Sequence, residues 1–312
     1  MHKIIEVKDL SKQFSGNTVV DRLSFSVFKG DVFGFLGQNG AGKSTTIRML
    51  LTLIRPSGGQ IKIFDKDLIH HRNEILSRVG AVIEKPDLYK YLSGLDNLSL
   101  FARLSGKWFT RKELNLKLGQ VGLEDRGRDK VRAYSQGMKQ RLGIAVALVH
   151  DPDLIILDEP TNGLDPQGIA DIRNLIRELS TDQQKSFLVS SHLLGEMEQI
   201  ANRMLIIDKG RKIVEGSVRE LVDPARLVLD IETTDNKACV KKLESSLWKD
   251  HLRQSGNGGK LLVDIARNEI PLLVRQLVEM DVQIISLKPV NSLEAYFLTL
   301  TKEKAYVEAG TN

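Results

Sequence analysis

The sequence predicts an α/β protein with a parallel sheet at its core and a small α+β domain at its C-terminal end. Three observations carry this prediction. Short, almost wholly apolar runs alternate with helical segments in the first two thirds of the chain, which is typical of buried parallel strands. A glycine-rich loop joins the first of these runs to a helix. After about Asp223 the sequence pattern changes, and a second set of strand-like and helix-like segments follows with apolar residues of its own.

The first sixty residues predict strands and one helix. "KIIEVKDL" and "DRLSFSVFKGD" alternate apolar and polar residues, as half-buried antiparallel strands do. "DVFGFLG" is more continuously apolar and runs into the glycine loop, and "KSTTIRMLLTLI" follows as a helix that "RPSGG" stops. We therefore expect an antiparallel layer before a strand–loop–helix unit.

The middle of the chain predicts a helical part followed by more buried strands. From about residue 88 to residue 149 the pattern is helical with polar breaks. "DLIILDE", "SFLVSSH" and "RMLIID" are apolar runs of strand length, and "KGRKIVEG" predicts a small hairpin. The helix predicted in "PQGIADIRNLIREL" has one apolar face, formed by Ile169, Ile172, Leu175, Ile176 and Leu179.

The C-terminal segment predicts the order β-α-β-β-α-β and a last helix at "SLEAYFLTLT". We therefore expect two domains, residues 1–222, with a helical subdomain at about 88–149, and residues 223–312. The second domain shows no catalytic constellation. A role in dimerisation and a role in regulation both stay open for it.

The composition limits where the protein works. The formal net charge of +5 is spread along the chain, so a solvated surface is the first interpretation and contact with anionic headgroups or nucleic acid the second. The single cysteine, Cys239, excludes an intrachain disulfide and fits a reducing compartment. No apolar run approaches the roughly 20 residues that span a bilayer, and the N-terminus lacks a signal-peptide core. We expect a cytoplasmic chain whose membrane role, if it has one, requires a partner.

"GQNGAGKS" fits the phosphate-loop pattern G-x-x-x-x-G-K-[ST] between a strand and a helix. Its glycines let backbone N–H groups wrap phosphate oxygens. Lys43 would bridge the β- and γ-phosphates, and the Ser44 hydroxyl would bind Mg²⁺. A chance match in a turn is the alternative, and the strand–loop–helix context disfavours it. The predicted ATP-binding residues of this loop are Gly37, Gln38, Asn39, Gly40, Ala41, Gly42, Lys43, Ser44 and Thr45.

Three further residues end apolar strands and predict hydrolytic chemistry. Asp158 and Glu159 follow "LIIL", so Asp158 would hold Mg²⁺ through water and Glu159 would act as general base toward the attacking water. Two acids after a strand also occur as a helix cap or a solvated turn. His192 ends the neighbouring run, where a hydrogen bond from its ring to the γ-phosphate is one interpretation and a structural histidine the other.

"AYSQGMKQRLGIA" poses a separate question, because it predicts a second helix N-terminus that is suited to an anion. Ser135 and Gly137 stand at the predicted helix start, where free backbone N–H groups and the helix dipole attract negative charge. The phosphate loop lies far earlier in the chain, so this helix needs a phosphate from elsewhere.

The phosphate loop, "YSQGM", "LIILDEP", "NGLD" and "SSH" occur in an order and spacing that resemble the ATP-binding subunit of an ABC transporter, over roughly residues 3 to 218. The resemblance implies that fold: a RecA-like core, an antiparallel β subdomain and a helical subdomain. It also implies an ATPase that binds ATP and Mg²⁺, pairs head to tail with a second copy or a homologous subunit, and drives a separate polytopic permease from the inner face of the cell membrane. No nucleic-acid partner is expected.

The resemblance answers the question that "YSQGM" poses. It implies that Ser135 and Gly137 close over the γ-phosphate of ATP held by the paired subunit. It implies that Phe14 stacks on adenine, where a core aromatic is the alternative, and that Asp165 lies in the loop that communicates between the subunits. Tyr134, Gln136 and Met138 depart from the common Leu, Gly and Gln.

Glu84 is a further departure, because the family usually has glutamine there. The resemblance implies contact with Mg²⁺ and water and a link to the membrane subunit, whereas a surface acid is the alternative. Glutamate at this position, "YSQGMKQRLGIA" and the C-terminal extension most resemble the group that exports bacitracin and lantibiotic-type peptides. The segment from Leu88 to Phe109 should contact the membrane partner, and Leu88, Tyr89, Tyr91 and Leu92 either line that contact or belong to the core.

Three other functions remain as alternatives. A soluble ABC-type ATPase that acts on ribosomes or DNA usually carries two ATPase halves or a long coiled-coil insertion, and neither is visible. A small-molecule kinase would share the phosphate loop but has no use for "YSQGM" and "SSH". A nucleotide-dependent binding module without turnover is disfavoured by Glu159.

Overall fold

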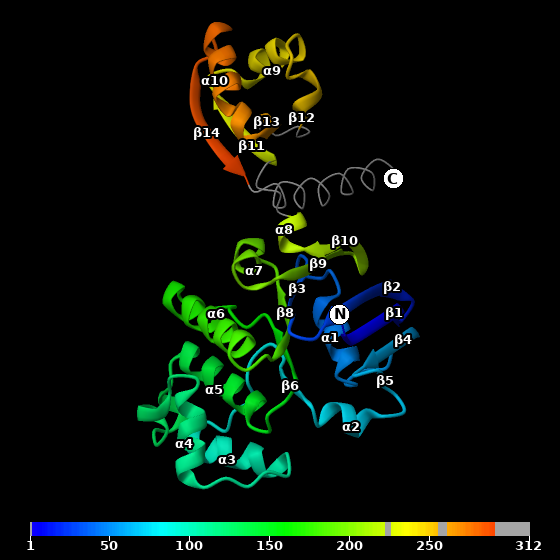
Figure 1. Ribbon diagram of the computed structural model, residues 1–312, viewed down its shortest axis with the longest axis vertical. Coiled ribbons are helices and arrows are strands. Elements are labelled where there is room, and N and C mark those ends of the chain that lie inside the picture. Colours follow the sequence, from blue (N-terminus) through cyan, green and yellow to red (C-terminus); the bar gives the residue numbers. More distant parts are fainter. Residues whose placement is uncertain (1, 222–225, 255–260, 291–312) are drawn as a thin grey trace. The chain divides into compact units, whose positions relative to one another are not determined.

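A computed structural model describes residues 2–221, 226–254 and 261–290 of the protein (Figure 1). The chain divides at Val218 into two compact units, residues 1–218 and residues 219–312. The first unit contains two of the described sheets and the second unit contains one, and each unit has its own apolar core.

An antiparallel sheet opens the first unit. Its strands are β1 (Lys3–Phe14), β2 (Asn17–Phe28), β4 (Gly58–Ile63) and β5 (Lys66–Asp67), in the order β2-β1-β4-β5. A two-residue turn with positive φ at both Ser15 and Gly16 joins β1 to β2, which is the turn geometry that matches strand twist. The predicted antiparallel layer is confirmed.

The second sheet of this unit is mainly parallel and has the order β10-β9-β3-β8-β7-β6. Only β10 runs antiparallel, through the predicted hairpin with β9. The carboxyl ends of parallel strands form one edge, and ligands bind there in open α/β sheets. The strands are β3 (Val32–Leu36), β6 (Val79–Val82), β7 (Leu154–Asp158), β8 (Ser186–Ser191), β9 (Arg203–Asp208) and β10 (Arg211–Ser217).

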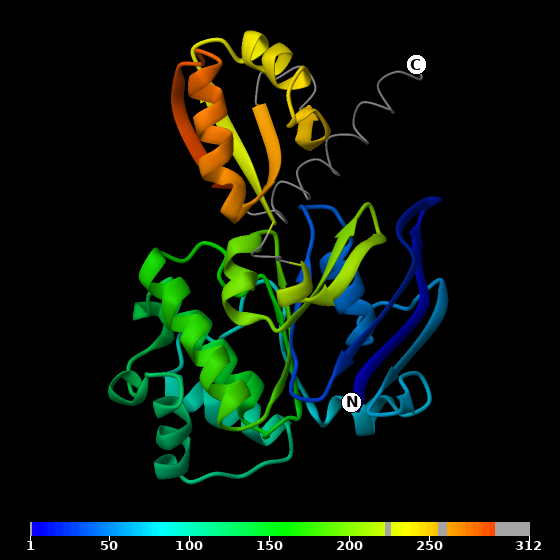
Figure 2. The same ribbon diagram turned by 45° about the horizontal axis from the view of Figure 1, so that its top comes forward.

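Helices surround this sheet, and the predicted helical subdomain is present. In both views α3, α4 and α5 lie on the side of the parallel sheet away from β1 and β2 (Figures 1 and 2). Short 3-10 helices at Glu124–Arg126 and Val131–Ala133 connect α4 to α5. The helices are α1 (Lys43–Leu50), α2 (Arg72–Leu76), α3 (Gly94–Leu104), α4 (Arg111–Gly119), α5 (Gln136–Leu148), α6 (Pro166–Thr181) and α7 (Leu194–Ile200). A short helix, α8 (Val218–Leu221), spans the boundary between the two units.

Helix α1 is shorter than the sequence predicts. It ends at Leu50, whereas the apolar pattern continues to Ile54. Thr52 adopts a left-handed φ of +59°, which a right-handed helix cannot contain. Its apolar residues still pack, because Ile47, Met49 and Leu50 lie in one buried cluster with residues of both sheets. In that cluster Phe25 stacks on Phe33 and Phe35, with ring centroids 5.9 and 5.6 Å apart. The helix after the phosphate loop is therefore anchored in the core.

The second unit shows the predicted order β-α-β-β-α-β, with strands arranged β12-β13-β11-β14. Both helices contribute to its core, where Cys239 is buried and Trp248 Nε1 donates to Gln276 Oε1 at 2.5 Å. The predicted last helix lies outside the described residues. The elements are β11 (Arg226–Thr233), α9 (Asn236–Glu244), β12 (Leu252–Gln254), β13 (Leu261–Ala266), α10 (Ile270–Glu279) and β14 (Ile284–Val290), with 3-10 turns at Lys249–His251 and Arg267–Glu269.

Candidate active site

The phosphate loop curls between β3 and α1 in a shape that only glycine permits at two points. A Cβ atom on Gly37 would lie 2.7 Å from the Ile207 carbonyl oxygen. Gly42 caps α1 with φ +102°, and a Cβ there would lie 2.9 Å from the Val19 carbonyl oxygen. Because the two glycines touch neighbouring backbone, the loop follows one path and its N–H groups keep one arrangement.

Lys43 is 5% exposed and turns back into this loop. Its Nζ donates to the carbonyl oxygens of Gly37 at 2.7 Å and Gln38 at 3.3 Å. The same Nζ lies 3.1 Å from Glu159 Oε1. A buried ammonium at the N-terminal end of α1 is the charge that a polyphosphate requires. Ser44 and Thr45 follow in the first turn of α1 and are half-buried.

Glu159 brings the lysine and the histidine together. It follows β7 with a left-handed φ of +50°, an unusual conformation for a residue with a side chain. Its Oε1 contacts Lys43 Nζ, and its Oε2 lies 2.8 Å from His192 Nδ1. The structure thus brings together three predicted residues from three separate segments, with Lys43 and His192 each in contact with Glu159.

Asp158 ends β7 with a carboxylate that is 1% exposed. Its Oδ1 accepts a hydrogen bond from Ser190 Oγ at 2.6 Å. Its Oδ2 is buried and has no hydrogen-bond partner within the part of the chain that the structure describes. A buried carboxylate oxygen of this kind needs an external partner.

The donors near the loop fit Mg²⁺. This ion prefers oxygen ligands and is usually held by one or two protein groups together with water and phosphate oxygens. Asp158 offers a free carboxylate oxygen, and Ser44 offers a hydroxyl in the first turn of α1. No cluster of three or more His, Cys, Asp or Glu side chains suited to a metal occurs in residues 2–221, 226–254 and 261–290, so a site made wholly of such side chains is absent there.

The residues of the predicted second anion site line a separate hollow of about 390 Å³. Ser135 caps α5 by accepting from Met138 N at 3.2 Å, and Asp165 caps α6 by accepting from Gly168 N at 2.9 Å. A hydroxyl that accepts here can still donate its own proton. None of the lining residues belongs to the phosphate loop; they are Ser135, Gln136, Gly137, Arg141, Gly163, Leu164, Asp165, Gln167, Gly168 and Asp171.

Tyr134, one of the departures in this motif, is an internal anchor. It is 3% exposed, and its hydroxyl donates to the Arg126 carbonyl oxygen at 2.7 Å. Burial raises the pKa of Tyr134, so the phenol keeps its proton for this bond. This hydrogen bond ties Tyr134, the residue before Ser135, to the 3-10 turn Glu124–Arg126 that follows α4, a contact that the sequence alone did not indicate.

The direct contacts of Glu84 and Phe14 are with residues outside the Lys43–Glu159–His192 cluster. Glu84 follows β6 with a left-handed φ of +55°, and its Oε1 lies 2.5 Å from Arg48 Nη2 on α1. Phe14 ends β1 with 45% of its surface exposed, and Lys12 Nζ lies 4.7 Å from its ring centroid. The alternative of a core aromatic is therefore wrong for Phe14, and its ring is available to a partner.

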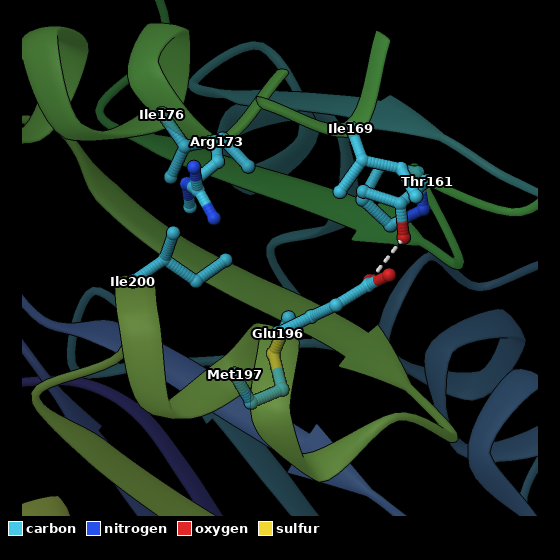
Figure 3. A pocket seen from close by; sticks show the side chains of 8 residues that line it. Thr161, Ile169, Arg173, Ile176, Glu196, Met197 and Ile200 are labelled. Carbon is cyan, nitrogen blue, oxygen red and sulfur yellow. Dashed lines mark hydrogen bonds between the residues drawn. The ribbon is translucent and has the colours of Figure 1, made fainter. Parts of the chain in front are cut away.

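A cavity between α6 and α7 is not a second site. It holds only about 10 Å³, at the lower limit for one water molecule. Ile169, Ile176, Met197 and Ile200 surround most of it, and Thr161 Oγ1 donates to Glu196 Oε2 at 2.5 Å on one side (Figure 3). It is a packing gap between two helices.

A phosphate loop that enters a helix beside a strand-end aspartate and glutamate defines a nucleotide-hydrolysing P-loop protein. Comparisons with known proteins specify the class. The family model described as "ABC transporter" matches residues 20–162. An ABC transporter ATP-binding protein of Bacillus subtilis, YhcH, is 40% identical over 306 residues, which cover 97% of this chain and 97% of the relative. The bacitracin transport ATP-binding protein BcrA of Bacillus licheniformis is 38% identical over 314 residues, covering 96% and 98%.

Solved structures agree. An ATP-binding subunit of an ABC transporter superposes with a TM-score of 0.63 at 31% identity, covering 70% of this chain and 91% of that one. A dimeric ATP-binding cassette bound to ADP and phosphate, MJ0796, has a TM-score of 0.62 at 23% identity, covering 69% and 99%, and shows the shared fold.

The chain belongs to the ABC transporter family, as an ATP-binding subunit. It is an ATPase, and the predicted fold class and family resemblance are confirmed. Among the described residues no helix has both the length and the apolar content that crossing a bilayer requires.

Proposed function

We propose that this ATPase powers export through a separate membrane-spanning partner, at the inner face of the cell membrane, as a head-to-tail dimer with ATP between the two subunits. One observation carries the proposal. The Lys43–Glu159–His192 cluster holds the groups for cleavage, whereas the Ser135–Asp165 hollow contains none of the phosphate-loop residues. The hollow thus offers N–H and hydroxyl donors to a phosphate that a second subunit brings.

Each side chain of the cluster has a proposed role in hydrolysis, which its contacts support. Lys43 balances the charge of the β- and γ-phosphates, and the loop N–H groups hold their oxygens. Glu159 accepts the proton of the attacking water, and His192, at 2.8 Å from Oε2, orients that carboxylate and reaches the γ-phosphate. Ser44 and Asp158 would hold Mg²⁺, with Glu84 as a third oxygen donor. The ion supplies electrostatic neutralisation of the phosphate oxygens.

Ser135→Arg tests the dimer. The arginine side chain is larger than serine and would fill the hollow. ATP-induced dimerisation should therefore be lost, while nucleotide binding by the monomer is retained. Light scattering with a slowly hydrolysed ATP analogue measures the first, and a fluorescent nucleotide titration measures the second. Thr110→Arg is the matched control, because Thr110 caps α4 through a comparable side-chain bond to Glu113 N and does not line the hollow. Unchanged dimerisation of Ser135→Arg would refute the assignment of this hollow to the dimer interface.

We propose a peptide antibiotic or a similar compound as cargo. BcrA relatives are named for bacitracin transport, and one relative from Streptomyces peucetius is named for daunorubicin and doxorubicin resistance. If Glu84 couples hydrolysis to the membrane subunit, Glu84→Ala should lower bacitracin resistance of cells more than it lowers basal ATPase activity. Equal loss of both would indicate a purely catalytic role for Glu84.

The membrane partner is expected to contact the start of the helical subdomain. Tyr89 and Tyr91 are 42% and 67% exposed, and their rings meet edge to face with centroids 5.9 Å apart. Leu88 and Leu92 are both half-buried, so each has part of its side chain in the interior and part at the surface. Exposed aromatic pairs of this kind serve as anchors in protein interfaces.

The first experiment is to isolate the tagged chain from native membranes in mild detergent and to identify its partners by mass spectrometry. A polytopic protein with apolar spans of about 20 residues each supports the exporter. Recovery with ribosomes or DNA instead would favour a soluble ABC-type ATPase and would end the export proposal.

A further inference from the structure

Ser190 is a polar side chain in the middle of the buried sheet. It is completely buried in β8, where its neighbours Phe187, Leu188 and Val189 are all buried apolar residues. In the parallel register of β7 and β8, Ser190 pairs with Asp158. A hydroxyl in such surroundings is costly unless both its donor and its acceptor capacity are used.

Both capacities are used on the two acids of the adjacent strand. Ser190 Oγ donates to Asp158 Oδ1 at 2.6 Å, and it accepts the backbone N–H of Glu159 at 2.9 Å. The short first bond has the length of a hydroxyl bonded to a charged carboxylate. One side chain therefore holds the carboxylate of Asp158 and the backbone of Glu159 at once.

We propose that Ser190 is a positioning residue that aims the free oxygen of Asp158 at the metal and holds Glu159 in its left-handed conformation. Because Oδ1 is hydrogen-bonded to Ser190, the carboxylate of Asp158 cannot rotate freely. The unpartnered Oδ2 therefore stays on the side of the carboxylate away from the Ser190 hydroxyl. Because the Glu159 N–H is bonded to the same oxygen, the turn with φ +50° is tied to β8. This inference rests on the proposed Mg²⁺ site at Asp158.

Removing the hydroxyl has a specific physical consequence. In Ser190→Ala the Asp158 Oδ1 and the Glu159 N–H would both be buried without their partner. Asp158 could then rotate, and either oxygen could turn from the metal. Outer hydrogen bonds that orient metal ligands typically change metal affinity by about 10–100-fold.

Ser186 offers a matched control on the same strand. It is 1% exposed, and its Oγ accepts one backbone N–H, that of Gly30, at 2.9 Å. Ser186 lies at the amino end of β8, whereas the site lies at the carboxyl end. Ser186→Ala thus removes a buried hydroxyl and one backbone contact from the same strand without touching either acid.

The test measures Mn²⁺ binding by electron paramagnetic resonance, with the full-length protein saturated with a non-hydrolysable ATP analogue and the analogue alone as blank. Ser190→Ala should bind Mn²⁺ about 10–100-fold more weakly than the unmodified protein. Its affinity for the analogue in EDTA should be unchanged. Ser190→Thr, which keeps the hydroxyl, should restore most of the Mn²⁺ affinity, and Ser186→Ala should bind Mn²⁺ normally.

The outcomes separate this inference from the proposed function. Mn²⁺ affinity of Ser190→Ala equal to that of the unmodified protein, while Asp158→Asn loses affinity, overturns the role of Ser190 and leaves the metal site standing. Unchanged affinity in Asp158→Asn overturns the metal site and this inference with it. Weaker analogue binding by Ser190→Ala in EDTA, or an equal loss in Ser186→Ala, would show a general disturbance of the sheet and overturn the positioning role.

Discussion

Gly94 and Tyr134 approach each other so closely that glycine is required at the start of α3. A Cβ atom added to Gly94 would fall far inside van der Waals contact with the Tyr134 hydroxyl oxygen. The next nearest atoms, Tyr134 Cζ and the Gly127 carbonyl oxygen, lie at an acceptable 3.4 Å. The hydroxyl is held by its bond to the Arg126 carbonyl, so it cannot move aside without losing that bond. The two positions should therefore be strongly coupled in stability.

The magnitudes follow from these contacts. Gly94→Ala alone forces overpacking of a buried site, which costs about 1–3 kcal/mol. Tyr134→Phe alone removes one buried hydrogen bond, which costs about 0.5–1.5 kcal/mol. In the double variant the clashing oxygen is gone, so most of the cost of Gly94→Ala disappears. We expect the double variant to be at least as stable as Gly94→Ala alone, with a coupling free energy of about 1–2 kcal/mol.

Differential scanning calorimetry of the full chain measures this cycle. The transition of the first unit is identified by its rise when nucleotide is added, because a ligand stabilises the unit that binds it. A change of 1 kcal/mol shifts Tm by about 2–4 °C in a unit of this size. If the Tm losses of the two single variants add in the double variant to within about 1 °C, the steric argument is refuted.

Three further changes have defined outcomes. Gly37→Ala should abolish nucleotide binding in a fluorescence titration, because its Cβ would meet the backbone of β9, whereas Gly58→Ala, with open space at its Cβ, should bind normally; equal affinities would contradict the loop geometry. Glu159→Gln should keep ATP binding and lower kcat by about 10²–10⁴-fold, as expected for loss of a general base, and turnover near that of the unmodified enzyme would exclude that role. Burial lowers the pKa of His150, and the bond from its ring to the Val79 carbonyl only partly opposes this. The unfolded chain then binds more protons below a pH of about 6.5, so stability should fall as the pH drops through that value toward the lower folded pKa. The Tm of His150→Gln should fall less between pH 7.5 and pH 5.5 than the Tm of the unmodified protein. Identical falls would refute the assignment of this pH dependence to His150.

The predicted site residues that the structure brings together are those whose placement follows from local spacing and strand order. The loop from Gly37 to Ser44 is contiguous, so its pattern specifies its own shape and the strand and helix on either side. Asp158 and Glu159 end a run of strand length, and parallel strands share one edge, so their place beside the loop follows from topology. The contact of Glu159 with His192 also depends on β7 and β8 being neighbours in the sheet.

The residues that the sequence did not indicate make contacts between different strands or turns. The alignment of those elements is not encoded in any local sequence pattern. Ser190 looked like one polar residue in "LVSSH", and only the pairing of β7 with β8 sets it opposite Asp158 rather than one residue away. A shift of one residue would turn its side chain to the other face of the sheet. Tyr134 looked like a departure in a motif, and its reason is a carbonyl eight residues earlier. Such contacts depend on packing geometry, which residue spacing cannot supply.

The pair formed by Glu84 and Arg48 places the unusual acid of this chain on the helix that leaves the phosphate loop. Both side chains are well exposed, at 62% and 42%, so their ion pair adds little to stability. What the contact shows is the element beside which Glu84 lies. Arg48 follows Ser44 by one helical turn on α1, so a carboxylate held at 2.5 Å from Arg48 is tied to the element that carries the hydroxyl proposed to bind Mg²⁺. Glutamine at residue 84 would keep an oxygen that can accept from Arg48, but it would lose the negative charge of the ion pair. The acid at residue 84 therefore has its counter-charge in Arg48 beside it.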